Sequence, residues 1–491
     1  MAFQVSIFQT DTFQVDEIIP IYVVEIELTT GNWTDISAYC KHANISRQLA
    51  TAETGLSVGI AQITVMNNDG RFSPNNSNGA YYPNMKINKA VRIKATYNSV
   101  NYWLFTGVTD HFIVNPTVGD KTCTITLSDK IKILQYRNIT LPLKININVK
   151  ILFEDVLDAI GITSTYRTID AIYDTISFAW FQNDRAIEVL NELLLYGNYQ
   201  MYVGPDGTLN IKDRYWGIAG TSIATYAEFE NIGYEIGDDI ANYIIVSGSP
   251  RIQATAVTVI ASITDITIIN AGATVTFTLP YYDTVTKETG VPAIDVVTPI
   301  ATTDYTAEGS TGVDRTANLV VNVTIYGASV DCQVTNNHTL AVSLTKFQLR
   351  GKPIQKQFDV SATSDDATSI AAYGQRTYAI NTDYISTLQY AQDYGDYIKT
   401  KKKINVHDTS IGIKNIWPDV TIREIGNIIT LTESNTGING KYVICGIEHD
   451  IMMAEGFEHI NNYELTQWID NEFLMLDDVV MGKLDNRRLA F

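Results

Sequence analysis

The N-terminal part of this sequence is constrained most by one turn-rich stretch, Asn67 to Pro74, which reads Asn-Asn-Asp-Gly-Arg-Phe-Ser-Pro. A short alternating run, Ile63 to Met66, precedes it and predicts a strand. The Asp-Gly pair permits positive φ and turns the chain, and the Ser-Pro pair disfavours a helix. Two more predicted strands follow, over residues 90–97 and 102–108. The residues alone therefore indicate a hairpin loop between strands, with Phe72 buried beneath it.

The order of these elements resembles the N-terminal barrel of phage tail-tip and baseplate hub proteins, many of which are labelled minor tail proteins. The resemblance covers roughly residues 20–130 and continues after the loop with Tyr-x-Pro at Tyr81, a valine-rich strand and the triplet that ends at Gly107. It identifies a structural module and implies no chemistry. It also implies that five loop residues set the geometry of the barrel and its neighbour. These residues are Asp69, Gly70, Arg71, Phe72 and Pro74.

The length and composition predict a multidomain chain with ample core. At 491 residues we expect three or four domains, and 45% of the residues are hydrophobic. No apolar run approaches the roughly 20 residues of a membrane span, and Met1 to Gln4 lack the basic flank of a signal peptide. Four widely spaced cysteines form no metal-binding pattern and are expected to be buried thiols. They are Cys40, Cys123, Cys332 and Cys445. These features fit a protein that folds in a bacterial cytoplasm and is then built into a particle.

The net charge predicts how the protein behaves toward nucleic acid. The formal charge is −19 and the pI is about 4.7, which opposes attraction to a polyanion. We therefore expect no stable nucleic-acid binding. An acidic channel wall would repel phosphates and let DNA slide past, which we keep as a hypothesis.

The hydrophobic pattern predicts a mainly β fold with a small α/β layer, divided into four parts. Residues 1–145 are predicted to form an N-terminal β-barrel hub domain, and residues 146–238 an α/β domain of helices and a hairpin. Residues 239–355 are rich in Thr, Val, Ile and Ala and predict an inserted β-sandwich. Residues 356–491 are predicted to form a second hub domain with a helix and a C-terminal β-barrel.

Two helices are expected in the α/β part. Apolar residues from Leu152 to Ile160 have helical spacing, and Gly161 stands at the C-cap position. A second helix is predicted to start at the cap residues Asn183-Asp184 and to end at Gly197. A comparable helix and hairpin unit recurs in the hub family between its barrels.

A second motif, Tyr373-Gly374-Gln375-Arg376, also resembles a hub-family signature. The resemblance implies that Tyr373, Gly374 and Arg376 anchor the second half of the chain. The motif is expected to precede a helix over about residues 383–399. The lysine-rich run that follows, Lys399 to Lys403, is interpreted as cations at a helix C-terminus, worth up to about 1 kcal/mol.

The last β segment repeats the strand order of the first. Strands over 88–94, 105–111 and 124–128 correspond to strands over 426–431, 443–449 and 462–466. Gly107 aligns with Gly446, and both glycines are expected to allow close strand approach. A chance likeness between two β-meanders is the competing interpretation. If the repeat is real, three chains present six barrels, and the resemblance implies a trimer with a pseudo-sixfold ring. A simple hexamer stays open if one barrel contributes.

The sequence shows no catalytic or metal-binding motif. The six histidines form no His-Glu-x-x-His pattern, and there is no P-loop and no nucleophile elbow. Among 54 acidic residues, paired carboxylates are inevitable and identify no glycosidase. We predict no metal, no cofactor and no enzyme activity. The 28 tyrosines suit subunit interfaces, a glycan-binding surface or core packing, and Tyr390, Tyr394 and Tyr397 are among the candidates for exposed clusters.

These observations together predict a structural virion protein, assembled in the host cytoplasm, that forms the hub ring at the distal end of a phage tail. Its expected partners are further copies of itself, the tail tube or distal tail protein, the tape-measure protein and a central spike or fibre. DNA would pass through the ring. Two alternatives stay open: a hexameric distal tail protein that carries receptor-binding proteins, or a glycan-binding or depolymerising tail-tip protein.

Overall fold

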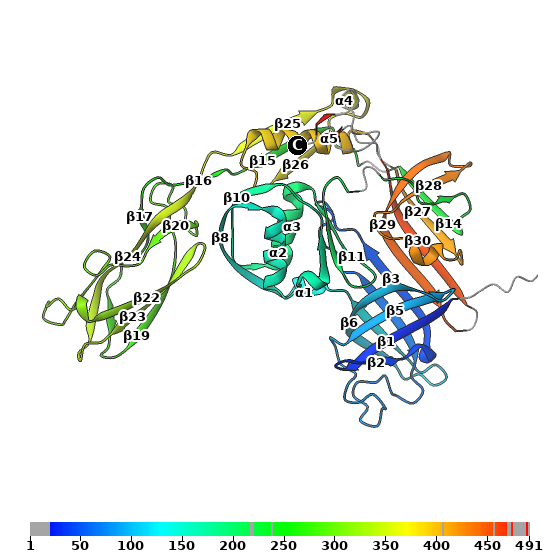
Figure 1. Ribbon diagram of the computed structural model, residues 1–491, viewed down its shortest axis with the longest axis horizontal. Coiled ribbons are helices and arrows are strands. Elements are labelled where there is room, and N and C mark those ends of the chain that lie inside the picture. The colour runs from blue at the N-terminus through cyan, green and yellow to red at the C-terminus, as the bar shows by residue number, and fades with distance from the viewer. Residues whose placement is uncertain are drawn as a thin grey trace, which may run out of the picture.

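The computed structural model describes residues 20–216, 220–236, 239–404, 407–454, 457–468, 473–474 and 488–489. The fold is mainly β, as predicted. Figure 1 shows an elongated molecule with a β-sandwich at one end, a helix-containing unit in the middle and a large sheet at the other end. None of the described helices is both long and apolar enough to cross a membrane.

The large sheet is built from both ends of the chain and has 13 described strands. Its N-terminal strands are β1 (Ile21–Thr29), β2 (Asn32–Asp35), β3 (Cys40–Gln48), β4 (Ile60–Met66), β5 (Ala90–Tyr97), β6 (Val100–Asn115) and β7 (Thr122–Ser128). Two strands come from the middle of the chain, β13 (Thr225–Tyr226) and β14 (Asn231–Ile236), although residues 146–238 were predicted to form the α/β domain. The C-terminal strands are β27 (His407–Lys414), β28 (Ile428–Glu433), β29 (Ile438–Met452) and β30 (Glu458–Gln467).

The two halves of this sheet are joined by the pairing of β3 with β29. The pair is antiparallel and runs from Gly446 opposite Gln48 to Met452 opposite His42. The described order is therefore β14-β27-β30-β29-β3-β4-β7-β6-β5-β1-β2. β28 pairs with the first half of β29, and β13 pairs with β28. The segments predicted to form two separate barrels share one set of backbone hydrogen bonds, which the sequence did not indicate.

Each half contains a three-stranded antiparallel meander of the predicted kind. In the first, β6 lies between β5 and β7, and in the second, β29 lies between β28 and β30. One face of the sheet is buried because apolar and polar residues alternate, as in β1 with its buried Val24 and Ile26. The strand order on which the predicted repeat depends is present, and the relation of the two meanders stays a prediction.

The middle unit contains two helices that pack on short strands around one core. Its elements are α1 (Ile131–Leu134), β8 (Asn138–Asn148), α2 (Val149–Ala159), β9 (Arg167–Ile169), β10 (Thr175–Arg185), α3 (Ala186–Gly197), β11 (Gln200–Val203) and β12 (Leu209–Lys212). Asn148 caps α2 by accepting a hydrogen bond from the Lys150 amide. The predicted start of α3 was wrong, because Asn183-Asp184 lie in β10. The predicted end was right: Gly197 is the last helical residue, and Asn198 follows as the C-cap in the left-handed conformation, at φ 52°.

A smaller layer of β15 (Tyr243–Gly248), β25 (Val360–Asp365), β26 (Thr377–Asn381), α4 (Ala367–Tyr373) and α5 (Leu388–Lys402) lies beside this unit. β15 falls within residues 239–355, which we assigned to the sandwich, yet its partners are β25 and β26. The helix expected over 383–399 begins later, because Thr387 caps it by accepting from the Tyr390 amide.

The sandwich lies between β15 and β25 and has its own core around Cys332, Phe347 and Leu349. One sheet contains β16 (Arg251–Gln253), β17 (Thr258–Ile263), β18 (Thr267–Ile269), β20 (Ala293–Val297) and β21 (Tyr305–Glu308), all paired with β24 (Val342–Lys356). The other contains β19 (Thr274–Pro280), β22 (Leu319–Ile325) and β23 (Ser329–Asn336). The remaining short elements are η1 (Ser37–Tyr39), η2 (Ser164–Tyr166), η3 (Thr316–Asn318), α6 (Asp419–Ile422), β31 (Phe473–Leu474) and β32 (Arg488–Leu489).

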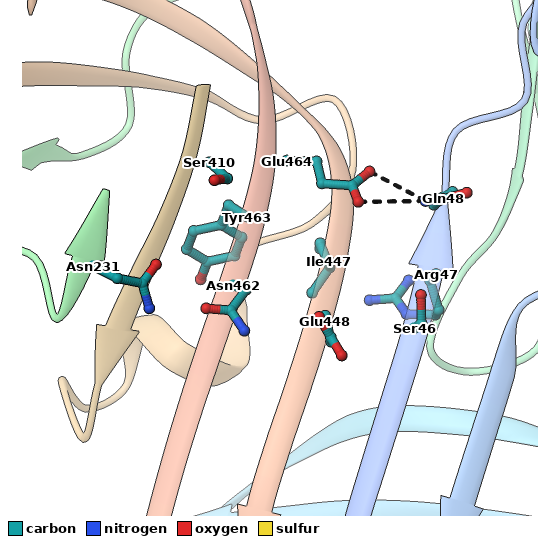
Figure 2. A pocket seen from close by; sticks show the side chains of 10 residues that line it. All are labelled: Ser46, Arg47, Gln48, Asn231, Ser410, Ile447, Glu448, Asn462, Tyr463 and Glu464. Carbon is teal, nitrogen blue, oxygen red and sulfur yellow. Dashed lines mark hydrogen bonds between the residues drawn. The ribbon is translucent and has the colours of Figure 1, made fainter. Parts of the chain in front are cut away.

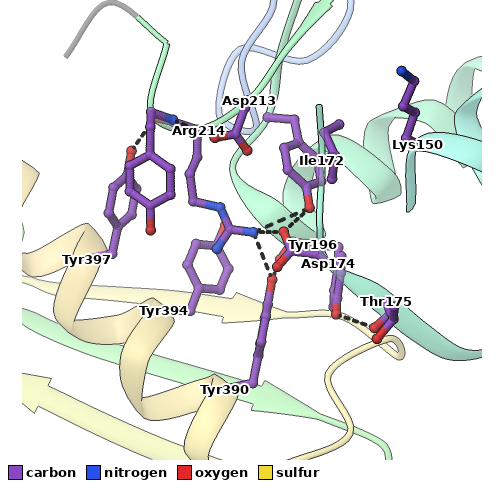
Figure 3. A network of polar contacts seen from close by, with 12 residues as sticks. Lys150, Ile172, Asp174, Thr175, Tyr196, Asp213, Arg214, Tyr390, Tyr394 and Tyr397 are labelled. Carbon is purple, nitrogen blue, oxygen red and sulfur yellow. Dashed lines mark hydrogen bonds and ion pairs between the residues drawn. The ribbon is translucent and has the colours of Figure 1, made fainter. Parts of the chain in front are cut away.

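A buried arginine joins the middle unit to α5 (Figure 3). Arg214 is 2% exposed; its guanidinium donates to Asp174 and, at 3.3 Å, to the hydroxyl of Tyr390 on α5. In return, the Tyr397 hydroxyl donates to the backbone oxygen of Arg214 at 2.9 Å. The Tyr394 hydroxyl donates to the backbone oxygen of Leu195 on α3 at 2.6 Å. These α5 tyrosines therefore hold two parts of one chain together. Of the roles considered from the sequence, core packing is the one that their contacts favour.

The close approach at Gly107 gives a first testable prediction. A Cβ atom there would lie 2.4 Å from the backbone oxygen of Ser128, so Gly107→Ala forces two strands apart. We expect a loss of about 1–3 kcal/mol in the free energy of unfolding, measured by urea denaturation. Gly440→Ala is the matched control in β29, where the nearest atom would be 3.9 Å away. Equal losses in the two variants would contradict the strand-approach role.

Asp129, at the end of β7, gives a pH-dependent prediction. Its carboxylate accepts from the Gly59 and Ile131 amides at 2.8 Å, but burial dominates and raises the pKa of Asp129 to about 7. Ionisation therefore opposes folding, and this penalty grows as the pH rises from the ordinary value near 4 to about 7. Relative to Asp129→Asn, the wild-type chain should lose stability over that window by up to about 1.4 kcal/mol per pH unit.

The measurement is the unfolding free energy of both proteins at several pH values, with Asp365→Asn, at an exposed position of β25, as the control. A wild-type minus Asp129→Asn difference that stays constant between pH 4 and pH 7 would refute the account.

Candidate assembly site

A polar depression crosses the joined sheet where its two halves meet (Figure 2). Its volume is about 330 Å³. Ten residues from β3, β14, β27, β29 and β30 line it, and we refer to this side of the five strands as the polar face. The lining residues are Ser46, Arg47, Gln48, Asn231, Ser410, Ile447, Glu448, Asn462, Tyr463 and Glu464.

The strand register places these side chains in two rows that run across the strands. One row contains Ser410, Glu464 and Gln48, with Gly446 between the last two. The adjacent row contains Asn462, Glu448 and Ser46. Residues two apart on a strand share a face, so both rows project to the same side. The buried neighbours Ile447 and Tyr463 project to the opposite side.

Glycines let polar side chains of neighbouring strands lie directly against the polar face. A Cβ at Gly412 would lie 2.4 Å from the Asn231 amide nitrogen, and one at Gly446 would lie 2.5 Å from Glu464 Oε2. Gly446 also marks the point where β29 changes its neighbour from β28 to β3, next to a register shift after Ile444. The side chains of Asn231 and Glu464 therefore occupy the space that a side chain at Gly412 or Gly446 would need.

The electrostatic character of the polar face is acidic. Glu448 and Glu464 are exposed, and their described partners are neutral amides: Asn44 donates to Glu448 at 3.0 Å, and Gln48 donates to Glu464 at 3.2 Å. The strand alternation places further carboxylates on the same side of these strands. These are Glu235, Asp408, Asp450 and Glu458. Lys414 on the same side is paired with Glu458 at 3.1 Å, so the described carboxylates outnumber the lysines. Such a surface repels phosphates.

The predicted loop residues lie away from this depression and interact with one another. Arg71 forms an ion pair with Asp69 and lies over the Tyr39 ring at 4.2 Å, and this hydrogen-bonded pair lowers the pKa of Asp69. Gly70 has φ 72°, as the turn requires. Phe72 is fully buried, with its ring 5.4 Å from that of Tyr81. Pro74 follows in the same turn-rich loop. None of these residues lines the depression, and their interface role stays a prediction.

The second motif has a local structural explanation. Gly374, at φ 76°, ends α4, and its carbonyl accepts from the buried Asn242 side chain at 2.9 Å. The Arg376 amide donates to the same side chain at 2.8 Å. Tyr373 is 47% exposed. The motif ends α4, because Gly374 breaks the helix, and it precedes the expected helix, α5, with β26 between them. Its anchoring role stays a prediction.

Two histidines form a buried contact between the two halves. The Tyr22 hydroxyl lies 2.6 Å from Nδ1 of His459, whose Nε2 lies 3.0 Å from His449. Burial lowers the pKa of His459 to about 3 and lowers that of His449, so both rings are neutral near pH 7. In the described part of the chain, no group of three or more His, Cys, Asp or Glu residues could hold a metal ion.

Sequence reasoning identified Gly446 but none of the side chains around it. Glu448, Glu464 and Gln48 are ordinary polar positions of amphipathic strands, and the signal available was their alternation with apolar residues. That alternation predicts a solvent face. It does not show that two distant strands present that face together.

The sequence matches no protein-family model and no curated protein. Solved structures do match. A tail protein from Neisseria meningitidis MC58 has a TM-score of 0.50 at 8% identity, covering 90% of this chain and 96% of that chain. The 43 kDa tail protein of prophage MuSo2 from Shewanella oneidensis has a TM-score of 0.48 at 12% identity, covering 90% and 97%.

A type VI secretion component from E. coli, described as similar to T4 bacteriophage tail proteins gp27 and gp5, has a TM-score of 0.42 at 8% identity and covers 91% and 77%. At these identities the likeness concerns the fold alone, and the Neisseria protein is the structure that supports it. The prediction from the loop motif is confirmed at that level: the chain has the fold of a tail protein.

Proposed function

We propose that this chain is a structural hub protein that forms a ring at the distal end of a phage tail. The observation that carries the proposal is the single sheet in which β3 and β29 join two β-meanders and present one continuous acidic polar face. The four-part division at 1–145, 146–238, 239–355 and 356–491 belongs to the same proposal. We also propose that the chain has no enzymatic role.

The acidic polar face is proposed to line the path of DNA. Its exposed carboxylates, Glu448 and Glu464, have amide partners, so their charges are not neutralised by a cation. The one cation among the lining residues, Arg47, is buried and projects to the other side of the sheet, where it is paired with Glu424 at 2.8 Å. A wall of this kind offers no free Lys or Arg charge that could displace the cations condensed on DNA. Release of those cations is what drives DNA binding. DNA would therefore slide along the wall without being held.

The ring is proposed to contain three copies. Because each chain has two meanders, such a ring would present six similar units, a pseudo-sixfold face, to a hexameric tube. The tail tube or distal tail protein, the tape-measure protein and a central spike or fibre are the proposed partners. The virion tail tip, after assembly in the host cytoplasm, is the proposed location.

The number of copies tests the ring directly. We expect native mass spectrometry of the purified full chain, or a reconstruction of the tail tip, to show three copies. Six copies would favour the hexameric distal tail protein. A chain that stays monomeric in the assembled particle would contradict both.

Charge reversal on the polar face tests its role in DNA passage. The double variant Glu448→Lys with Glu464→Lys should still assemble, since both side chains are exposed, but it should bind double-stranded DNA at low salt and slow its release from particles. The measurements are fluorescence anisotropy on the purified chain and DNA ejection from assembled particles. Glu308→Lys with Asp265→Lys, at two exposed positions of the sandwich, changes the net charge by the same amount and is the control. Unchanged ejection in the double variant would show that the polar face does not line the DNA path.

A further inference from the structure

A second and larger cavity, of about 580 Å³, lies where three parts of the chain meet. Residues of β6, of the hairpin β11–β12 and of the segment after α6 line it. The hairpin is held against β6 because the Thr106 hydroxyl donates to the carbonyl of Pro205 at 2.9 Å. The volume falls in the range of roughly 300–1,000 Å³ that is typical of small-molecule sites. The proposed hub function makes no use of this cavity.

Arg47, one of the lining residues, carries a buried N–H donor that has no acceptor among the described residues. Arg47 alternates along β3 with Ser46 and Gln48, so its side chain lies on the side of the sheet opposite the polar face. The side chain is 4% exposed, and Nη1 donates to Glu424. Its Nε is buried and has no hydrogen-bond partner among the described residues. A buried N–H without an acceptor is unfavourable, and an oxygen of a bound molecule would relieve it.

Aromatic rings in fixed positions form part of the wall. Tyr202 is stacked on Trp216 with ring centroids 5.6 Å apart and an interplanar angle of 18°. Tyr202 lines the cavity together with Glu424 and Arg47. Trp103 lines the cavity as well and is held by Arg92, 5.5 Å from its ring centroid. Rings that are already ordered bind a ligand at low entropic cost.

The charges in the wall balance one another. Arg47 and Arg423 are the cations, and Glu424 and Asp206 are the carboxylates. Arg423 is also paired with Asp419 at 2.7 Å. The remaining polar groups are neutral amides and hydroxyls, such as Asn210. A wall of this kind favours a neutral ligand with many hydroxyl groups over a phosphate or an ammonium compound.

We propose that this cavity is a binding site for a neutral saccharide of one or two rings. The apolar face of a sugar ring would pack on Trp103 or Tyr202, a ring or hydroxyl oxygen would accept from Arg47 Nε, and its hydroxyls would donate to Glu424. The inference stands independently of the ring and of the DNA path.

The test is ligand-observed NMR and calorimetry on the full chain, with methyl β-glucoside, N-acetylglucosamine and the β-1,4-linked dimer of N-acetylglucosamine as probes. We expect saturable binding of at least one probe. Trp103→Ala should weaken it about tenfold through the loss of ring packing. Thr168→Trp, which adds bulk at an exposed position of the cavity wall, should abolish it.

Tyr173→Ala is the control, because Tyr173 is 88% exposed and does not line the cavity. Urea denaturation shows whether each variant is folded, and Thr168→Trp removes no contact of the core. Glucose 6-phosphate and glucosamine are the charged comparators. No saturable binding of any neutral probe, equal binding by wild type and Thr168→Trp, or tighter binding of a charged comparator would each overturn the proposal.

Discussion

The pairing of β3 with β29 is the interaction on which the rest of this structure depends. It joins residues about 400 positions apart through a regular antiparallel register, from Gly446 opposite Gln48 to Met452 opposite His42. Backbone hydrogen bonds leave little freedom of rotation between strands, so the two meanders are fixed relative to each other. The pairing also decides which side chains become neighbours. Because β29 pairs with β3, Glu448 lies beside Ser46. For the same reason Glu464 of β30 lies within hydrogen-bond distance of Gln48, on the other side of β29.

The same pairing separates two chemical environments on the two sides of one sheet. On the polar side, exposed carboxylates have amide partners and define an acidic surface. On the other side, Arg47 is buried with Glu424, and the neutral pair His449 and His459 lies close to Tyr22. Because side chains alternate along each strand, both environments come from the same short segments. A substitution that shifted the register by one residue would exchange them.

The parts outside the sheet are attached by fewer and more specific contacts. The middle unit is connected to α5 through Arg214 and the α5 tyrosines, whose hydroxyls reach backbone carbonyls across the junction. The sandwich continues from β15 and β25 through the paired segments Arg251–Gln253 and Ile354–Lys356. A turn of the sandwich also contacts the middle unit, where the Gln182 side chain donates to the Ser329 hydroxyl. Buried polar junctions of this kind are selective for one arrangement because an unpaired group inside them is costly.

The sequence by itself determined the individual elements. Strand patterns located β5 at residues 90–97 and the C-terminal end of β4 at Met66, the Asp-Gly pair located the turn at Gly70, and the Thr-rich composition indicated the sandwich. Helix starts were less accurate: Asn183-Asp184 belong to strand β10, and Thr387 caps α5 a few residues after its predicted start. The loop motif carried the correct fold resemblance.

Only the tertiary structure decided which strands are neighbours. β15 was placed with the sandwich by composition, but it pairs with β25 and β26, and neither that choice nor the pairing of β3 with β29 has a local signature. The polar face and the second cavity both depend on such long-range neighbours, so their residues could not be singled out beforehand. The physical reason is that periodicity records which side of a strand is buried, whereas the partner of an edge is selected by the summed packing of segments that are distant in the chain.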